Sequence, residues 1–388
     1  MPNSWGVVMI VASFNVENMF RRPIVLNGDN NAAARLVLDE FSAFQSLLDK
    51  TTYTVADKAK IIQFLKDFGL DKTDEGPVVY LRRSRGQLVT RPKTGPVVVS
   101  ASGRDDWIGW LELKREAVSA IATRNTARVI GDLKADVLAV IEAEDRPTLV
   151  RFNRDVFGPM QAAEPAKSDQ WKYRHVMLLD GNDDRGIDVG LFAKDGYNII
   201  NLRTHVDELG VNGEPIFSRD CAEYLIETPG GNQVLFLVNH FKSKGHGTQA
   251  SSNAKRTAQA QRVAEIYRDR RQQGINNIVV LGDLNDTDQS APLHGLIVNS
   301  DLLDVSTLGP PIFDNTGRTG TYGTGGEKID YLLCSPALIN LVTSAGIFRQ
   351  GVWRGPKVKN PWTMYDTITS EVQSASDHAA IWAEINLN

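Results

Sequence analysis

Apolar residues along the chain follow two spacings, one typical of buried strands and one typical of amphipathic helices. The apolar run Val7–Val11 leads into Asn15 and Glu17, which predicts a buried strand that ends in polar groups. Similar runs predict strands at 136–145, His175–Leu179, Asp188–Phe192, Cys221–Glu227, Val234–His240, Asn277–Leu281, Ile329–Cys334 and Ala379–Ile385. Helical spacing predicts helices over Glu116–Leu133 and Ser252–Gln273, the second with its arginines and glutamines facing outward. This alternation of helix and strand indicates an α/β sandwich.

The segment from Pro23 to Arg115 has a different character. Apolar residues at helical spacing predict two helices in it, Ala32–Leu48 and Val55–Phe68. Two β-branched runs then flank the turn candidate Arg85-Gly86 and predict a hairpin. The hairpin carries five basic residues with no acid among them, namely Arg82, Arg83, Arg85, Arg91 and Lys93. It is either a solvated edge that its charges protect from aggregation or an arm that contacts phosphates.

The composition is that of an ordinary globular protein, with 42% hydrophobic and 23% charged residues. A net charge of -4 argues against a surface coated in basic residues, so a polyanion would have to be met by a local patch. The two cysteines, Cys221 and Cys334, lie in apolar strand-like surroundings and are expected to be buried thiols. A zinc site built on cysteines is therefore excluded.

The beginning of the chain predicts a strand and not a leader peptide. The run Val7–Val11 is short, and it lacks both a basic leader and a small-residue cleavage site. No uninterrupted apolar stretch approaches the roughly 20 residues that a membrane-spanning helix needs. We therefore expect no membrane partner.

Polar side chains appear within one or two residues of a strand end at five places: SFNVEN, VIEAED, VNHFKSK, VVLGDLND and SASDHAAIW. In the fourth, Asp283 and Asn285 are one residue apart, so their side chains point the same way in an extended segment. In the fifth, Asp377 adjoins His378, which combines a metal ligand with a group that transfers protons. Each motif alone also fits an Asp-rich turn or a polar strand start. Five in one chain favour a site assembled at strand ends.

Read in order, the motifs FNVEN, DVLAVIEAED, GIDVGLF, VNHFKSK, LGDLNDTDQSAPL, KIDYLLCSP and SDHAA resemble the endonuclease/exonuclease/phosphatase superfamily. The resemblance covers Val7–Phe20 and Thr126–Asn388. It implies a four-layered α/β sandwich in which two packed mixed sheets are flanked by helices. It also implies one catalytic domain over residues 1–388, with residues 23–115 as an insertion of helices and a basic hairpin.

The resemblance implies that Glu142 is the main metal-binding carboxylate, with Asp377 and Asn15 beside the same cation. Two features depart from the family pattern. Ile141 stands where many relatives have glutamine, and Glu144 competes for the ligand role. We favour Glu142, because Glu144 shares its strand face but lies farther into the loop. Oxygen-rich ligation favours Mg²⁺ or Mn²⁺ over zinc.

The resemblance also assigns the proton-transfer groups. Asp283 and Asn285 would orient the attacking water or protonate the leaving oxygen, and His378 would contact the phosphate and share in proton transfer. His240 would be the second histidine, typical of the deoxyribonuclease-like branch. The supporting residues would be Asp188 orienting His240, Asp330 orienting His378, and Arg219 and Asn15 contacting the phosphate.

These assignments predict a metal-dependent phosphodiesterase, with a nuclease that cleaves DNA, and also RNA, as the first hypothesis. The continuation of GDLN, with HFKSK and YGTGGEKIDY, resembles that of secreted or periplasmic bacterial nucleases. The alternatives are a phosphatase or phospholipid phosphodiesterase of the same fold, and an inactive binding module. The expected partner is a nucleic-acid substrate, and no obligate protein partner is evident.

The other histidines have no acidic or metal context in the sequence, and we expect surface or structural roles for them: His175, His205, His246 and His294. His246 differs in one respect. It follows His240 in the glycine-flanked loop KSKGHGTQ, whose Lys242 and Lys244 could meet a polyanion.

Overall fold

The computed structural model describes residues 7–17, 19–24, 31–183, 185–244, 248–314, 318–359 and 361–387. The chain divides into two compact units. The large unit comprises Met1–Phe20, Val118–Ser243 and Ala250–Asn388, and the small unit comprises Arg21–Ala117 and Lys244–Gln249.

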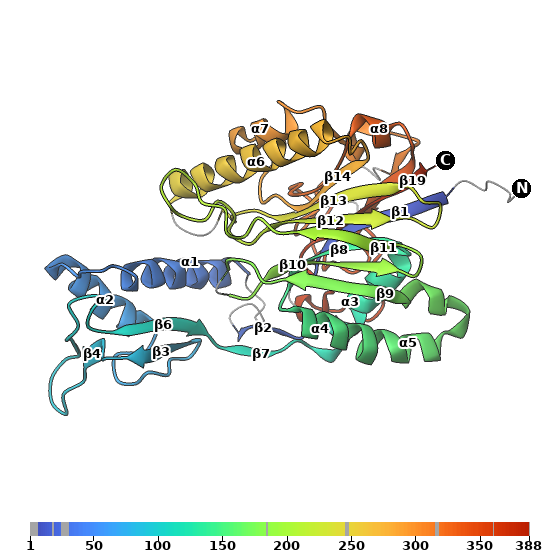
Figure 1. The fold of residues 1–388 in the computed structure, drawn as a ribbon. Coiled ribbons are helices and arrows are strands. Elements are labelled where there is room, and N and C mark those ends of the chain that lie inside the picture. The colour runs from blue at the N-terminus through green and yellow to red at the C-terminus, as the bar shows by residue number, and fades with distance from the viewer. Residues whose placement is uncertain are drawn as a thin grey trace, which may run out of the picture. The chain divides into compact units, whose positions relative to one another are not determined.

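The large unit contains two mixed β-sheets (Figure 1). The seven-stranded sheet has, in spatial order, β16 (Phe313–Asp314), β18 (Val342–Phe348), β19 (Ala380–Leu387), β1 (Val7–Asn15), β8 (Val137–Ala143), β10 (Asp188–Lys194) and β9 (Tyr173–Leu179). The six-stranded sheet has β11 (Asn198–Arg203), β12 (Cys221–Glu227), β13 (Gln233–His240), β14 (Ile278–Asp283), β17 (Asp330–Cys334) and β15 (Leu303–Asp304). The α-helices are α3 (Ala120–Leu133), α4 (Arg146–Phe152), α5 (Gly158–Ala163), α6 (Gln249–Gln272), α7 (His294–Ile297) and α8 (Pro336–Ile339).

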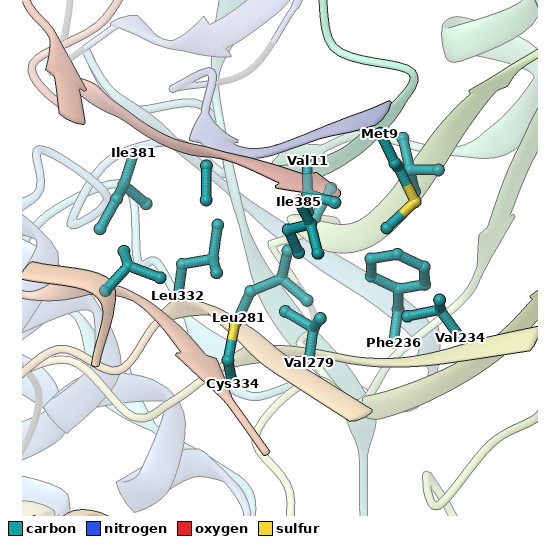
Figure 2. Close-up of a cluster of buried hydrophobic side chains, with 14 of the residues drawn as sticks. Met9, Val11, Val234, Phe236, Val279, Leu281, Leu332, Cys334, Ile381 and Ile385 are labelled. Atoms are coloured by element: carbon teal, nitrogen blue, oxygen red, sulfur yellow. The ribbon is translucent and has the colours of Figure 1, made fainter. Parts of the chain in front are cut away.

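The central strands are apolar along their whole length because both of their faces are covered. On β8, Val137, Ala139 and Ile141 face the core between the two sheets. Leu138 and Val140, which point the opposite way, belong to a second core on the other face of the same sheet. Figure 2 shows part of the core between the sheets, to which both contribute: Met9, Val11, Val234, Phe236, Val279, Leu281, Leu332, Cys334, Ile381 and Ile385.

Helices cover the outer faces of both sheets. Val129 and Ile130 of α3 pack into the outer core of the seven-stranded sheet. Val263 and Tyr267 of α6 pack into the outer core of the six-stranded sheet. The layers are therefore helix, sheet, sheet and helix, and the expected four-layered α/β sandwich is confirmed (Figure 1). Among the described residues, no helix is long and apolar enough to cross a membrane.

The predicted strands of the large unit are all present, and both cysteines are buried free thiols as expected. The helix predicted from Glu116 begins at Ala120, because Ser119 accepts N-terminal backbone hydrogen bonds as its cap and Arg115–Ala117 forms β7. Strands β11 and β18 were not predicted from the sequence.

The prediction that α6 turns its arginines and glutamines outward is wrong for Arg256, Gln259 and Arg270, which are buried. Arg256 Nε donates a hydrogen bond to Asp286 Oδ2 at 3.0 Å, and Arg270 is bonded to Glu223. These buried charges are tolerated because each meets an acid on the sheet side. Helical periodicity cannot foresee such long-range partners.

The small unit has helices α1 (Asn31–Leu48) and α2 (Val55–Asp67), as predicted, and three two-stranded sheets. Thr54 and Asp57 form a capping box that fixes the start of α2. The sheets pair β2 (Arg21–Pro23) with β7 (Arg115–Ala117), β3 (Val79–Arg85) with β6 (Ile108–Leu113), and β4 (Val89–Thr90) with β5 (Val98–Val99).

The predicted hairpin around Arg85-Gly86 is wrong. Strand β3 pairs with β6 and not with β4, because this register places Leu81 opposite Leu111 in the core of the small unit. Its charge is also partly compensated, since Arg82 pairs with an acid at 2.9 Å and Arg91 pairs with one at 2.8 Å. Those acids are Glu112 and Asp74, which lie outside the basic segment Arg82–Lys93 in the sequence.

Candidate active site

Three polar residues lie at one edge of the six-stranded sheet. Strands β13 and β14 are parallel and β17 is antiparallel, so the register pairs His240 with Asp283 and Asp283 with Asp330. Val238 and Leu281, two residues earlier on their strands, face the core between the sheets. The side-chain period of two therefore turns His240 and Asp283 toward the other sheet.

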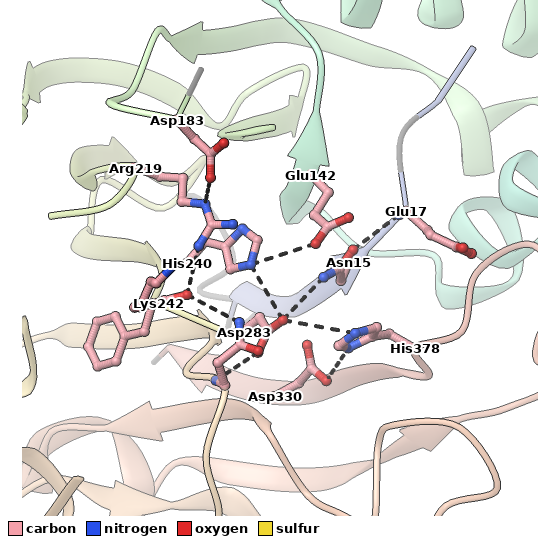
Figure 3. Close-up of polar contacts among 12 residues, drawn as sticks. Asn15, Glu17, Glu142, Asp183, Arg219, His240, Lys242, Asp283, Asp330 and His378 are labelled. Carbon is pink, nitrogen blue, oxygen red and sulfur yellow. Dashed lines mark hydrogen bonds and ion pairs between the residues drawn. The ribbon is translucent and has the colours of Figure 1, made fainter. Parts of the chain in front are cut away.

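The same edge of the seven-stranded sheet supplies the opposing residues. Asn15 and Glu142 stand at the ends of parallel strands β1 and β8, and Asp377 and His378 precede antiparallel β19. Asn15 Nδ2 donates a hydrogen bond to Asp283 Oδ2 at 3.2 Å, which joins the two sheets here (Figure 3). The five predicted motifs thus meet in space.

The backbone is strained where these strands end. Glu17, Glu142 and Asn285 have φ angles of 48°, 66° and 54°, in the left-handed region that side chains other than glycine rarely adopt. Gly282, beside Asp283, has φ 129°, and a Cβ there would lie 2.0 Å from the carbonyl oxygen of Asn239. Non-glycine residues in such conformations cost about 1–3 kcal/mol each and gather at functional sites.

His378 is held between carboxylates. Its Nδ1 lies 2.8 Å from Asp330 Oδ2, and its Nε2 lies 3.9 Å from Asp283 Oδ2 and 3.8 Å from Asp377 Oδ1. Burial opposes the charged imidazolium, but the charge of Asp330, followed by that of Asp377, outweighs it and raises the pKa of His378 well above its usual value. Tyr322 packs edge-on against the ring, with the centroids 4.9 Å apart. Asp330 therefore orients His378 and favours its protonated form.

His240 has the opposite character. Burial, together with the neighbouring charge of Arg219, lowers the pKa of His240 well below its usual value. Its Nε2 lies 3.6 Å from both Glu142 Oε1 and Asp283 Oδ2, which is too far for a hydrogen bond (Figure 3). Its buried Nδ1 has no hydrogen-bond partner among the described residues. The site thus presents a neutral imidazole whose polar atoms can accept or donate to a bound group.

The expected pairing of Asp188 with His240 does not form. Asp188 Oδ1 instead accepts a hydrogen bond from the backbone N–H of Gly181 at 2.9 Å and so closes the loop between β9 and β10. A register shift between Asp188 and Val189 accompanies this change. Burial raises the pKa of Asp188 to about 7.

A buried ion cluster near His240 was missed in the sequence. Arg219 is 1% exposed, its Nε lies 2.9 Å from Asp183 Oδ2, and its Nη1 donates to the carbonyl of Phe241 at 2.8 Å. Arg185 also binds the Asp183 carboxylate, at 2.7 Å. Two of the three guanidinium nitrogens of Arg219 thus contact groups of the protein, and its charge acts on His240. The run of aspartates that precedes GIDVGLF was the feature of the sequence from which this ion cluster could have been predicted.

Asn285 and its neighbours fix the loop after β14. The backbone N–H of Asn285 donates to Asp283 Oδ1 at 2.8 Å, and its side-chain amide donates to the carbonyl of Phe241 at 3.2 Å. Asp286 binds Arg256 of α6, a contact that the sequence did not reveal. The loop therefore holds the Asp283 carboxylate in one orientation.

A match to a known protein family identifies the family to which this chain belongs. The model of the endonuclease/exonuclease/phosphatase family matches residues 116–378, more than half of the chain. The chain belongs to this family. Its members are generally hydrolases that act on phosphoester bonds, and they typically depend on a divalent metal. No curated protein matches the sequence.

The solved structures to which this chain is similar are distant from it in sequence. An endonuclease/exonuclease/phosphatase family protein from Bacteroides thetaiotaomicron is 14% identical with a TM-score of 0.47, covering 68% of this chain and 86% of that one. The human Nocturnin catalytic domain with a bound sulfate anion is 15% identical with a TM-score of 0.47, covering 70% and 89%. A mannosyl-6-phosphatase from Bacteroides thetaiotaomicron is 14% identical with a TM-score of 0.44, covering 68% and 91%.

The donor groups fit the metal dependence of the family. Glu142 and Asp377 keep 21% and 24% of their side chains exposed, so a cation from solvent can reach them. Protein surrounds the Glu142 carboxylate on its other sides, and this burial, together with the charge of Asp377, raises the pKa of Glu142. Neighbouring carboxylates that repel each other are the donors that a hard divalent cation stabilises. Glu144, the competing residue, instead accepts backbone hydrogen bonds from the loop after β1.

A second group of possible ligand atoms belongs to Asp283, Asp330 and His378, which lie within 4.8 Å of one another. A histidine binds metal only as a neutral imidazole, and the acids around His378 raise its pKa and so favour the protonated form. Glu142 and Asp377 are therefore the better donors, and Asn15 Oδ1, which accepts from the N–H of Glu17, retains a second lone pair.

The expectation for His205 is corrected in part. It has an acidic context, because its two ring nitrogens lie 2.8 Å from Glu208 and 2.7 Å from Glu223. Arg262 and Arg270 bind these two acids in turn, so the network is structural and lies apart from the strand-end residues. His246 lies outside the described residues.

Proposed function

We propose that the protein is a divalent-metal-dependent nuclease that hydrolyses phosphodiester bonds of DNA, with RNA as a second substrate. The observation that carries this proposal is the pair of buried histidines on either side of Asp283. His378 is kept cationic by Asp330, and His240 is kept neutral by burial and by Arg219. Hydrolysis of a phosphodiester needs a cationic donor that stabilises the charge on the phosphate, together with groups that accept and donate protons or hydrogen bonds.

The proton transfers can be assigned to residues of this chain. Burial, followed by the charge of Asp330, raises the pKa of Asp283, which suits a carboxylate that accepts a proton from water near neutral pH. As the water oxygen bonds to phosphorus, the His378 imidazolium stabilises the charge on the phosphate. The leaving alkoxide takes the Nε2 proton of His378 as its bond to phosphorus breaks, and the proton that Asp283 took from water then passes to His378 Nε2, which lies 3.9 Å from Asp283 Oδ2.

Glu142 and Asp377, with Asn15 beside them, would hold the cation. When bound, Mg²⁺ or Mn²⁺ would offset charge on the non-bridging phosphate oxygens and lower the barrier to attack. The donor set is rich in oxygen and contains no cysteine, which favours these ions over zinc.

The test is a cleavage assay with purified protein. Incubation with supercoiled plasmid and Mg²⁺ should yield nicked and linear DNA, and an excess of chelator should stop the reaction. His378→Ala should abolish cleavage without changing the circular-dichroism spectrum. His294→Ala, which alters an exposed histidine in α7, is the matched control and should cleave like the wild type.

A substrate panel separates the proposal from its rivals. Release of inorganic phosphate from sugar or inositol phosphates, without plasmid cleavage under any metal, would show a phosphatase instead. Release of a phosphorylated head group from phospholipid would show a phospholipid phosphodiesterase. Binding of nucleic acid without any turnover would identify an inactive binding module.

A further inference from the structure

The two-stranded sheet of β3 and β6 in the small unit has one face whose side chains are exposed or half-buried. We call this the outer face. Residues opposite each other on antiparallel strands share a face. The register places three such pairs on it: Tyr80 opposite Glu112, Arg82 opposite Trp110, and Arg85 opposite Ile108.

The opposite face is buried, which makes the outer face unusual. Val79, Leu81, Leu111 and Leu113 pack into the core of the small unit and supply the stability of the sheet. The outward face of such a sheet is ordinarily polar. Here Trp110, which is 44% exposed, lies on the same face of β6 as Ile108, another exposed apolar residue. No aromatic ring or cation contacts the Trp110 indole among the described residues.

Contacts within the protein already hold the arginines of the outer face in place before any ligand binds. The Arg82 guanidinium lies 4.1 Å from the centre of the Tyr80 ring and binds Glu112 through two hydrogen bonds, at 2.9 and 3.2 Å. Arg85 donates to the backbone carbonyl of Asp105 at 3.3 Å, which leaves its other donors toward solvent. This arrangement lowers the entropy that these long side chains would lose on binding.

The outer face has an excess of positive charge. Arg82 and Lys114 are paired with Glu112 and Glu75, whereas Arg85 has no acidic partner among the described residues, in a chain whose net charge is -4. An anion is therefore the ligand that this local surface favours. The exposed indole adds a flat ring on which a nucleic-acid base can stack.

We propose that the outer face binds single-stranded nucleic acid, with a base stacked on Trp110 and the flanking phosphates at Arg82 and Arg85. This inference rests on the proposed nuclease function and names the form of substrate that the small unit recognises. A duplex keeps its bases stacked on each other, so its base faces are closed to an exposed indole. An unpaired strand offers both a free base face and a flexible backbone.

The test measures binding without cleavage. Full-length protein in chelator is titrated into a fluorescein-labelled 20-nucleotide oligothymidine or a 20-base-pair duplex, and fluorescence anisotropy is followed. Trp110→Ala should weaken oligothymidine binding about tenfold, within the range for loss of one stacked base, and change duplex binding little. Trp110→Phe should retain most of the affinity, because it keeps a ring.

The arginines are tested by the salt dependence of binding. The double variant R82Q/R85Q should reduce the slope of log affinity against log salt by about 1.4, since each single-strand phosphate contact contributes about 0.7. The matched control is Arg154→Gln, an exposed arginine of the large unit paired with Asp155. It should leave the slope unchanged.

The outcomes separate this inference from the proposed function. If the wild type cleaves plasmid but the Trp110 and arginine variants bind oligothymidine with wild-type affinity and slope, the outer face is not the binding surface. If the wild type neither cleaves nor binds nucleic acid, both proposals are overturned. Self-association that Trp110→Ala abolishes, measured by light scattering, would instead assign the face to contact with a second copy.

Discussion

Replacing Asp330 with asparagine removes the charge that faces His378 and keeps a group that can accept its Nδ1 hydrogen bond. The two atoms are 2.8 Å apart and both side chains are buried. A hydrogen bond to a charged group contributes about 1.5–3 kcal/mol and a neutral one about 0.5–1.5 kcal/mol. The midpoints of these ranges differ by about 1.25 kcal/mol, which corresponds to about one pKa unit. Asp330→Asn should therefore lower the pKa of His378 by about one unit.

The expected effect on activity has a definite sign. If the His378 cation is the active form, activity is lost as the pH rises through its pKa, which the wild-type carboxylates hold well above the usual value. In Asp330→Asn the alkaline limb of kcat/KM should move about one unit to lower pH, measured with a chromogenic phosphodiester and Mg²⁺. Asp220→Asn, another buried aspartate but on the far side of β12 from the site residues, is the control. An alkaline limb that stays in place in Asp330→Asn would refute the assigned charge of His378.

Three further predictions follow from the same contacts. Glu142→Gln should abolish both activity and the rise in Tm on adding Mg²⁺, without lowering the Tm of the metal-free protein. Glu144→Ala should instead lower the free energy of unfolding by about 1–3 kcal/mol, because it leaves two backbone N–H groups unpaired. The pKa values of Glu208 and Glu223 are lowered to about 2. A hydrogen bond from an arginine is the chief cause for Glu208, whereas for Glu223 the hydrogen bonds from an arginine and a histidine outweigh burial, which acts to raise the pKa. These ionised carboxyl groups stabilise the folded protein above the ordinary pKa of 4.5, and that stabilisation is lost as the pH falls toward 2. Glu223→Gln should therefore weaken the dependence of the free energy of unfolding on pH in the acid range, and an unaltered dependence would contradict this. Gly282→Ala should lower both Tm and kcat, because its Cβ would meet a β13 carbonyl at 2.0 Å, and a wild-type Tm would show that this strand pair can relax.

The sequence alone determined the strands, their period and the polar groups at their ends. Because side chains alternate along a strand, the residues that must face the inner core also fix which way Asp283 and His240 point. The family motifs added the pairing of Asp330 with His378, and the structure has that hydrogen bond at 2.8 Å. These features depend on local spacing, which a sequence displays directly.

Tertiary structure decided which distant groups meet. Asp183 binds Arg219 across 36 positions of the chain, and this contact sets the charge around His240, whereas Asp188 bonds to a nearby loop. In the small unit, β3 selects β6 over the adjacent β4 because only that register buries apolar residues on both strands. Which strands pair depends on how the sheets bring remote segments of the chain together. Which ions pair depends on which charges become buried and therefore need a partner. Local periodicity carries no information about either.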